Sequence, residues 1–196
     1  MKNLKTLVAH PLFRIFQNPI FLFVMWMCIT LVCCIFKLAQ GRYNNFLIFR
    51  QSYWDALAQI SLYLENLNAY LYGISFTVLI APFAVLPIPL GMILWCLANT
   101  AFLYYAIRKL EPETWKFTLI IWVSANDLYE AMVYQQYNVG IAAMIILAFV
   151  CIEKKKDFWA ALFIVVGTMT KIYGILGLAF ILFSKPGTIP KLAFIG

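Results

Sequence analysis

The chain alternates between long apolar runs and short polar stretches. The apolar runs cover residues 20–36, 72–86, 90–107, 117–125, 139–152 and 158–183. A helix that crosses a bilayer needs about twenty predominantly apolar residues. The pattern therefore predicts an all-α polytopic membrane protein, a transmembrane helical bundle of roughly 5–7 hydrophobic segments that forms a single domain over residues 1–196.

Residues 40–71 are too polar to lie in the hydrocarbon, and they carry an amphipathic pattern. Apolar residues recur there at steps of three and four, at Phe46, Phe49, Tyr53, Leu57, Ile60 and Leu64. A helix would place them on one stripe, with Gln51, Ser52 and Asp55 away from it. We expect an interfacial helix in the first non-cytoplasmic loop.

The basic residues predict which side of the membrane the loops face. The run 20–36 is too long for a signal-peptide core, so we expect a retained first span with a cytoplasmic N-terminus. The basic turn 153–157 predicts a second cytoplasmic position. An even number of crossings must then separate the two, yet five runs lie between them, those that begin at residues 20, 72, 90, 117 and 139. The short runs 72–86, which Pro82 interrupts, and 117–125 are the candidates for re-entrant segments.

Composition agrees with a multi-pass protein, which we place in the plasma (inner) membrane. Hydrophobic residues make up 64% and charged residues 12% of the chain, and its mean hydropathy is +0.86. The net charge of +7 comes from bases beside apolar runs, which argues against nucleic acid as a partner. The 5 cysteines lie in apolar runs without C-x-x-C spacing, so we expect neither a metal site nor a disulfide framework, and no cofactor.

Lys171 is the most unusual residue of the chain, since it lies inside the apolar run 158–183. A charged group in hydrocarbon is costly and marks a functional-site hypothesis by default. Either two short segments meet near Lys171 or one long tilted helix contains it. Counting about 1.5 Å per residue from the basic turn brings Lys171 to the non-cytoplasmic face, where the amides Gln135, Gln136 and Asn138 also lie. Such a cluster suits a lipid-linked phosphate; a snorkelling or carboxylate-paired structural lysine is the alternative.

Asp127 and Glu130 are three residues apart and share a helical face. Paired carboxylates there could do acid–base chemistry or bind a cation, or they could be solvated groups at the end of a span. At the other end of the chain, residues 192–196 begin a further apolar run, so we expect the sequence to be the N-terminal part of a longer one.

Several short motifs together resemble a known family. They are Tyr43-Asn44-Asn45-Phe46-Leu47-Ile48-Phe49-Arg50, the Pro82–Pro87 segment with Trp95 and Asn99 beyond it, Gln135-Gln136-Tyr137-Asn138, and Gly167–Gly174 around Lys171. In order and spacing, over most of residues 40–185, they are similar to glycosyltransferase family 87. The resemblance implies a GT-C fold and transfer of a hexose, often mannose, from a polyprenyl-phosphate donor to a lipid or glycan acceptor on the non-cytoplasmic face.

The resemblance also implies a first-loop aspartate that acts as general base on the acceptor hydroxyl. This sequence has Asn44-Asn45 at the matching place, and an amide cannot take that proton. Asp55 or Glu65 could substitute, or Asn45 could only position an acceptor. Arg50 and Lys171 are the candidates for holding the donor phosphate without a metal. A lipid-linked-sugar transporter or flippase, and a non-catalytic fragment, remain the alternative functions.

Overall fold

The computed structural model describes residues 14–63 and 70–182, and every regular element in these two ranges is helical. The elements are η2 (Ile15–Gln17), α2 (Pro19–Ala39), α3 (Asn44–Leu57), α4 (Phe76–Ala84), α5 (Ile88–Lys109), α6 (Thr114–Val133), α7 (Asn138–Glu153), α8 (Asp157–Thr170), η3 (Ile172–Leu178) and α9 (Ala179–Leu182). The prediction of an all-α fold is confirmed for these residues.

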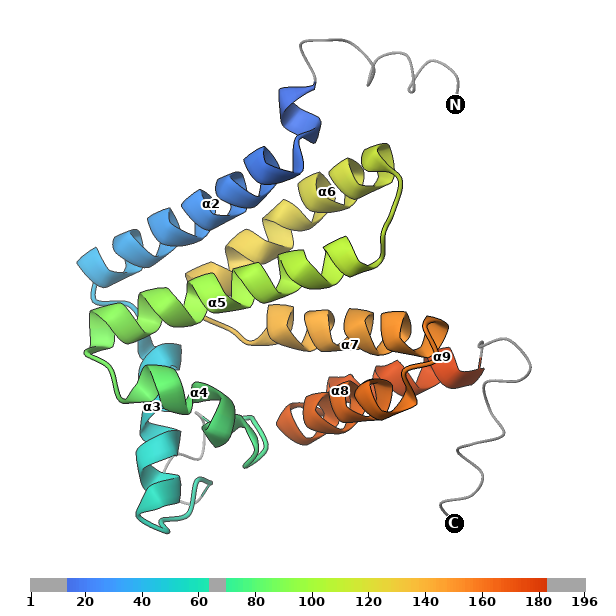
Figure 1. Cartoon of the computed structure of the whole chain (residues 1–196). Coiled ribbons are helices and arrows are strands. Elements are labelled where there is room, and N and C mark those ends of the chain that lie inside the picture. The colour runs from blue at the N-terminus through green and yellow to red at the C-terminus, as the bar shows by residue number, and fades with distance from the viewer. Residues whose placement is uncertain (1–13, 64–69, 183–196) are drawn as a thin grey trace, which may run out of the picture.

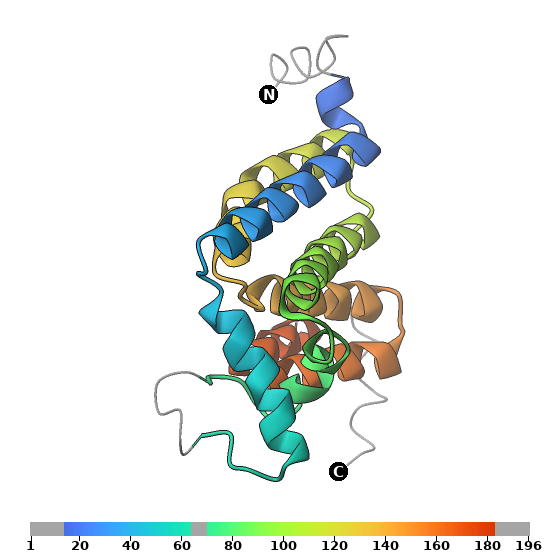
Figure 2. The same cartoon turned by 90° about the vertical axis from the view of Figure 1, so that its left-hand side faces the viewer.

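The long helices form a bundle in which the chain reverses direction at each turn (Figure 1). α5 lies between α2 and α7, α6 packs on α2, and α8 packs on α7. Figure 2 shows α2 and α6 side by side and α5 nearly end-on in the middle of the bundle. The core between them is mainly apolar, with Trp26, Met92 and Ile121 fully buried.

Local sequence fixes where α2 begins. Asn18 accepts hydrogen bonds at its Oδ1 from the backbone N–H groups of Ile20, at 2.8 Å, and Phe21, at 3.2 Å. This is the usual N-cap arrangement, and Pro19 follows at the first helical position, where a missing N–H costs nothing. A hydrogen bond of 2.7 Å between the buried hydroxyls of Thr30 and Thr100 then joins α2 to α5.

Two helices in the described ranges, α2 and α5, are long and apolar enough to cross a bilayer. α4 is not, because its 9 residues give a length of about 14 Å, roughly half the thickness of the hydrocarbon. The run 72–86 therefore forms a short helix at one end of the bundle rather than a crossing helix.

α3 runs across the end of the bundle, at a steep angle to α5 and α7 (Figure 1). Phe46 and Phe49 are buried, as the amphipathic pattern predicts. The prediction is wrong for the C-terminal half of the stripe. The helix ends at Leu57, which is 60% exposed, so Ile60 lies beyond it; Leu64 falls outside the described residues.

Ser52 is the second correction, because it is buried although we expected it to lie away from the apolar stripe. Its hydroxyl donates a hydrogen bond of 2.8 Å to the carbonyl oxygen of Phe49, so its burial leaves no polar group unpaired. The buried face of α3 turns toward α4, where the rings of Phe49 and Phe76 lie 4.8 Å apart.

The run 158–183 folds as two short segments that meet at Lys171, the first of the two predicted arrangements. Lys171 is extended, with φ −152° and ψ 132°, and it separates α8 from η3. η3 then runs back along α8: Gly174 lies against Gly167, and Gly177 against Ile164. A Cβ on Gly174 would come within 2.1 Å of the Gly167 carbonyl carbon, so the two segments pack at a distance that only glycine allows.

Candidate functional site

Lys171 lies at the tip of the hairpin that α8 and η3 form, and its ammonium has a defined set of neighbours. Nζ donates a hydrogen bond of 2.8 Å to Oδ1 of Asn138. It also lies 5.2 Å from the ring centroid of Tyr72 and 5.3 Å from that of Tyr173, within the range of cation–π attraction. The side chain is neither buried nor fully exposed. The contacts hold the ammonium in one place while leaving it accessible to a ligand.

The turn between α6 and α7 presents the amides. Asn138 begins α7, and its Nδ2 donates a hydrogen bond of 2.7 Å to Oε1 of Gln136. Gln135 is instead 2% exposed and left-handed, with φ 50°. Its side-chain Nε2 donates a hydrogen bond to the Val133 carbonyl oxygen. Its backbone carbonyl oxygen accepts a hydrogen bond of 3.4 Å from Trp95 Nε1. Gln135 therefore shapes the turn, whereas Gln136 and Asn138 join Lys171 in a hydrogen-bonded chain.

A segment before α4 fixes the hairpin tip. The N–H of Gly73 donates a hydrogen bond of 2.9 Å to the carbonyl oxygen of Thr170. A Cβ on Gly73 would lie 1.8 Å from the carbonyl oxygen of Met169, so only glycine fits. The hydroxyl of Tyr72 accepts a hydrogen bond of 3.3 Å from the Tyr137 N–H. This role was not predictable from the sequence, because an isolated Gly at the start of an apolar run is common between helices.

A groove begins at Gln136 and Asn138 and extends between α5, α6 and α7. Its volume is 470 Å³, within the usual range for ligand sites. Its polar lining residues are Ser124, Asp127, Glu130, Gln136 and Asn138, and its apolar ones are Leu103, Ile107, Leu110, Ile120, Leu128, Ala131, Val139, Ala142 and Ile146.

The polar lining residues gather toward one end of the groove, whereas apolar residues line all of it. Gln136 and Asn138 lie where α6 turns into α7, and the carboxylates Asp127 and Glu130 lie within the last turns of α6. Ile107, in the last turn of α5, and Leu110, which follows that helix, lie at the other end of the groove, beside the turn into α6. The groove is thus polar at one end, next to the partner of Lys171, and mainly apolar along the rest of its length. It suits a ligand with a polar head and a hydrocarbon tail.

The predicted residues of the first loop have other partners. Asn45 donates from Nδ2 to the carbonyl oxygen of Tyr134 at 2.7 Å, which ties α3 to the turn between α6 and α7. Arg50 donates from Nε to the carbonyl oxygen of Ala84 at 2.9 Å, at the C-terminal end of α4. Asp55 accepts a hydrogen bond of 2.7 Å at Oδ1 from Gln51 Nε2. Glu65 lies outside the described residues, so its predicted role stays a prediction.

Of the predicted site residues, the structure thus brings Gln136, Asn138 and Lys171 together. The side chain of Asn45 contacts the same turn, through its hydrogen bond to the backbone carbonyl oxygen of Tyr134. Arg50 and Asp55 are held by groups of α4 and α3. In residues 14–63 and 70–182, no group of three or more His, Cys, Asp or Glu side chains could hold a metal ion.

Comparison with known proteins supplies one match. The model of glycosyltransferase family 87 matches residues 70–188, more than half of the chain, which include the Gly73 segment, the groove and the hairpin with Lys171. None of the curated proteins and none of the solved structures compared with the chain matches it. The family consists of membrane glycosyltransferases. The resemblance to this family that the sequence motifs indicated is confirmed. The chain belongs to glycosyltransferase family 87.

Proposed function

We propose that the protein transfers a hexose, with mannose as the first candidate, from a polyprenyl-phosphate donor to a lipid or glycan acceptor on the non-cytoplasmic face of the plasma (inner) membrane. The observation that carries this proposal is the groove of α5, α6 and α7. Most of its wall is apolar, as a polyprenyl tail requires. At its polar end, Asn138 accepts a hydrogen bond from the Lys171 ammonium.

The proposal places α2, α5, α6 and α7 across the bilayer as a multi-pass bundle. Because α4 is too short to cross, four crossings separate the N-terminus from the basic turn. This even number places both on the cytoplasmic side. α3 and the Gly73 segment then lie at the non-cytoplasmic end, beside the polar end of the groove. α8 enters from the cytoplasmic side and carries Lys171 most of the way across, since its 14 residues rise about 21 Å.

Lys171 holds the donor phosphate in this mechanism. Its ammonium attracts the phosphate oxygens, while Asn138 and Gln136 fix the position of the ammonium. As the acceptor oxygen bonds to the anomeric carbon, the bond between that carbon and the phosphate oxygen breaks, and the polyprenyl phosphate leaves with both electrons. The charge that develops on the leaving phosphate is then stabilised by a group already in place.

The acceptor hydroxyl must lose a proton in the same reaction. We assign this proton to Asp127 or Glu130, because both carboxylates line the groove with Gln136 and Asn138. Asp55, one of the two first-loop carboxylates predicted from the sequence together with Glu65, is the alternative. It requires α3 to bring the acceptor to the groove, and Asn45 contacts the turn at the edge of the groove in a way that would support such an arrangement.

The test uses the chain purified in detergent, reconstituted into liposomes and supplied with polyprenyl-phosphate hexoses. Lys171→Gln is expected to lower the rate of transfer about a hundredfold, as the loss of one preorganised donor to a developing anion does. Lys155→Gln, which removes an exposed lysine outside the groove, is the matched control and is expected to leave the rate unchanged. Equal rates for Lys171→Gln and the unchanged protein would contradict the proposal.

A second set of variants tests which carboxylate accepts the proton of the acceptor. Loss of transfer in Asp127→Asn or Glu130→Gln, with Asp55→Asn active, would support the carboxylates of the groove. The reverse result would assign the base to the first loop. A transporter would instead move a fluorescent polyprenyl-phosphate hexose across the liposome without transfer, and it would do so unchanged in all three carboxylate variants.

A further inference from the structure

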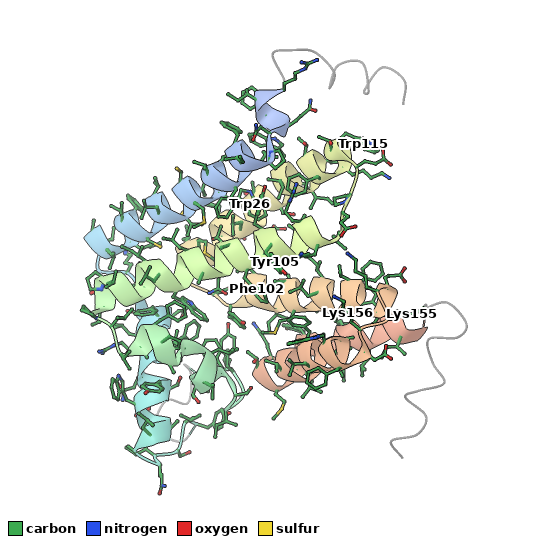
Figure 3. The ribbon with its side chains drawn as sticks, in the orientation of Figure 1. Trp26, Phe102, Tyr105, Trp115, Lys155 and Lys156 are labelled. Atoms are coloured by element: carbon green, nitrogen blue, oxygen red, sulfur yellow. The ribbon has the colours of Figure 1, made fainter. Side chains whose placement is uncertain are left out.

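A second pocket lies between α5, α7 and α8, at the end of the bundle away from Gln136 and Asn138. Its volume is 330 Å³, and it shares no lining residue with the groove. Lys109 of α5, Lys154 at the end of α7 and Lys156 before α8 contribute its cationic groups. Figure 3 shows Lys155 and Lys156 at the turn that joins α7 to α8, at the end of the bundle away from α3 and α4.

The three lysines differ in how they are held. Lys154 donates from Nζ to Oε1 of Glu111 at 2.5 Å, so its charge is already paired with a carboxylate. The Lys109 ammonium lies 5.1 Å from the ring centroid of Tyr105, on the same helix. Glu111 does not line the pocket, although its carboxylate also interacts electrostatically with Lys109. The lining residues include three lysines and no carboxylate, so the lining carries a net positive charge. This charge favours an anionic ligand.

The remaining walls of the pocket are apolar or aromatic. Leu147, Val150 and Cys151 of α7 form its buried side, while Tyr105, Trp159 and Phe163 flank it. Tyr105 and Trp159 are 51% and 52% exposed, and amphipathic rings of this kind prefer the membrane–water interface. The cationic groups thus stand at the rim of an apolar surface rather than in an aqueous cleft, which favours a ligand that has acyl chains.

We propose that this pocket binds the headgroup phosphate of an anionic phospholipid of the cytoplasmic leaflet, with an acyl chain along Leu147, Val150 and Phe163. Basic pockets between helices on the cytoplasmic side of membrane proteins bind such headgroups through the same combination of charge and apolar wall. The site is separate from the groove proposed for the sugar donor, and it remains intact if the proposed activity is wrong.

The experiment counts bound lipids by native mass spectrometry of the detergent-purified chain, titrated with dioleoyl phosphatidylglycerol or with dioleoyl phosphatidylcholine. The unchanged protein is expected to retain one phosphatidylglycerol in preference to phosphatidylcholine. Lys109→Gln/Lys156→Gln is expected to weaken that binding about thirtyfold, the effect of removing two lysines at a membrane surface. The double substitution leaves the Lys154–Glu111 pair intact.

Two further variants keep the test specific. Lys116→Gln/Lys155→Gln removes the same charge from residues that do not line the pocket, and it should bind phosphatidylglycerol within twofold of the unchanged protein. Lys109→Arg/Lys156→Arg should restore binding. Equal weakening in both Gln variants, or equal binding of the two lipids by the unchanged protein, would overturn the proposal. Displacement of the lipid by millimolar inorganic phosphate would also overturn it, by assigning the pocket to a soluble anion.

Discussion

Asn45 illustrates how a residue predicted for chemistry can have a structural role. It donates through Nδ2 to the carbonyl oxygen of Tyr134, 89 positions along the chain. This bond joins the first loop to the turn that bears Gln136 and Asn138. A net contribution of about 1 kcal/mol is typical of such a bond.

Asn45→Ala is therefore expected to lower the free energy of unfolding by about 1 kcal/mol, measured by thermal unfolding in detergent. Asn44→Ala, at the exposed neighbouring position, is the control and is expected to unfold like the unchanged protein. If Asn45 also positions the acceptor, the Michaelis constant for the acceptor will rise in Asn45→Ala. Identical unfolding of both variants and the unchanged protein would show that the bond with Tyr134 contributes nothing.

Among the glycines that the structure describes, Gly73 has the least space for a side chain. Its N–H binds the Thr170 carbonyl oxygen, and a methyl group in place of its hydrogen would meet the Met169 carbonyl oxygen. Gly73→Ala is expected to destabilise the protein by about 1–3 kcal/mol, because backbone atoms on both sides must move. Thermal unfolding measures this change. Transfer by Gly73→Ala, assayed below its unfolding temperature, should also fall, since the tip that bears Lys171 shifts.

At the scale of elements, the hairpin depends on one close contact. Gly174→Ala is expected to separate η3 from α8, whereas Gly167→Ala is expected to be tolerated, since its nearest neighbour would lie 3.4 Å from the new carbon. Limited proteolysis and thermal unfolding of the two variants measure the difference. Equal stability of both would mean that the two segments do not pack as described.

Much of the element pattern was predictable because apolar periodicity is a local property of the sequence. The all-helical fold and the first-loop helix with Phe46 and Phe49 buried follow from such patterns. The apolar run around Lys171 allowed either two short segments or one long helix, and the structure shows the two segments. The end of α3 at Leu57 and the burial of Ser52 did not follow from such patterns, because they depend on how α3 packs on α4. Packing between distant segments leaves no periodic trace in either one.

The candidate site was also predictable only in part. Lys171 and the amides were predictable because a charge in an apolar run and a run of amides at its mouth are unusual in themselves. The separate role of Gln135, and the place of Asp127 and Glu130 in one groove with Gln136, were not predictable. They depend on a left-handed turn and on three helices whose contacts only the folded chain defines.

At the scale of the whole molecule, one ion pair joins two turns at the same end of the bundle. The hydrogen bond and charge of Lys154 lower the pKa of Glu111 below its ordinary value of 4.5. Because the folded pKa is the lower one, the pair stabilises the fold above pH 4.5, and this contribution disappears as the pH falls through the folded pKa. The effect is small, since both groups are exposed.

The unchanged protein should therefore unfold at a slightly higher temperature than Glu111→Gln at pH 7, and the two should converge below the folded pKa of Glu111. Unfolding in detergent across this pH range measures the difference. Glu153→Gln, which removes an exposed carboxylate at the end of α7, controls for the loss of charge. A difference between Glu111→Gln and the unchanged protein that persists in acid would contradict this origin of the stability.

The same ion pair makes a prediction about membrane sidedness. Because Glu111 contacts Lys154, the turn between α5 and α6 lies on the same side as the basic turn. A membrane-impermeant maleimide applied to inside-out vesicles should label Glu113→Cys and Lys155→Cys, whereas Asn44→Cys should react only from the other side. Each is compared with the parent chain and its 5 native cysteines. Labelling of Glu113→Cys and Asn44→Cys from one side would refute the four-crossing bundle.

The hydrogen bond between Gly73 and Thr170 also has a consequence for how the protein is assembled. A hairpin tip placed in the membrane needs partners for its backbone groups, because lipid supplies none. The segment that provides such a partner is synthesised almost a hundred residues before the tip. During biosynthesis the Gly73 segment is therefore already made when α8 leaves the ribosome, and the charged tip can bind to it instead of remaining in bare hydrocarbon.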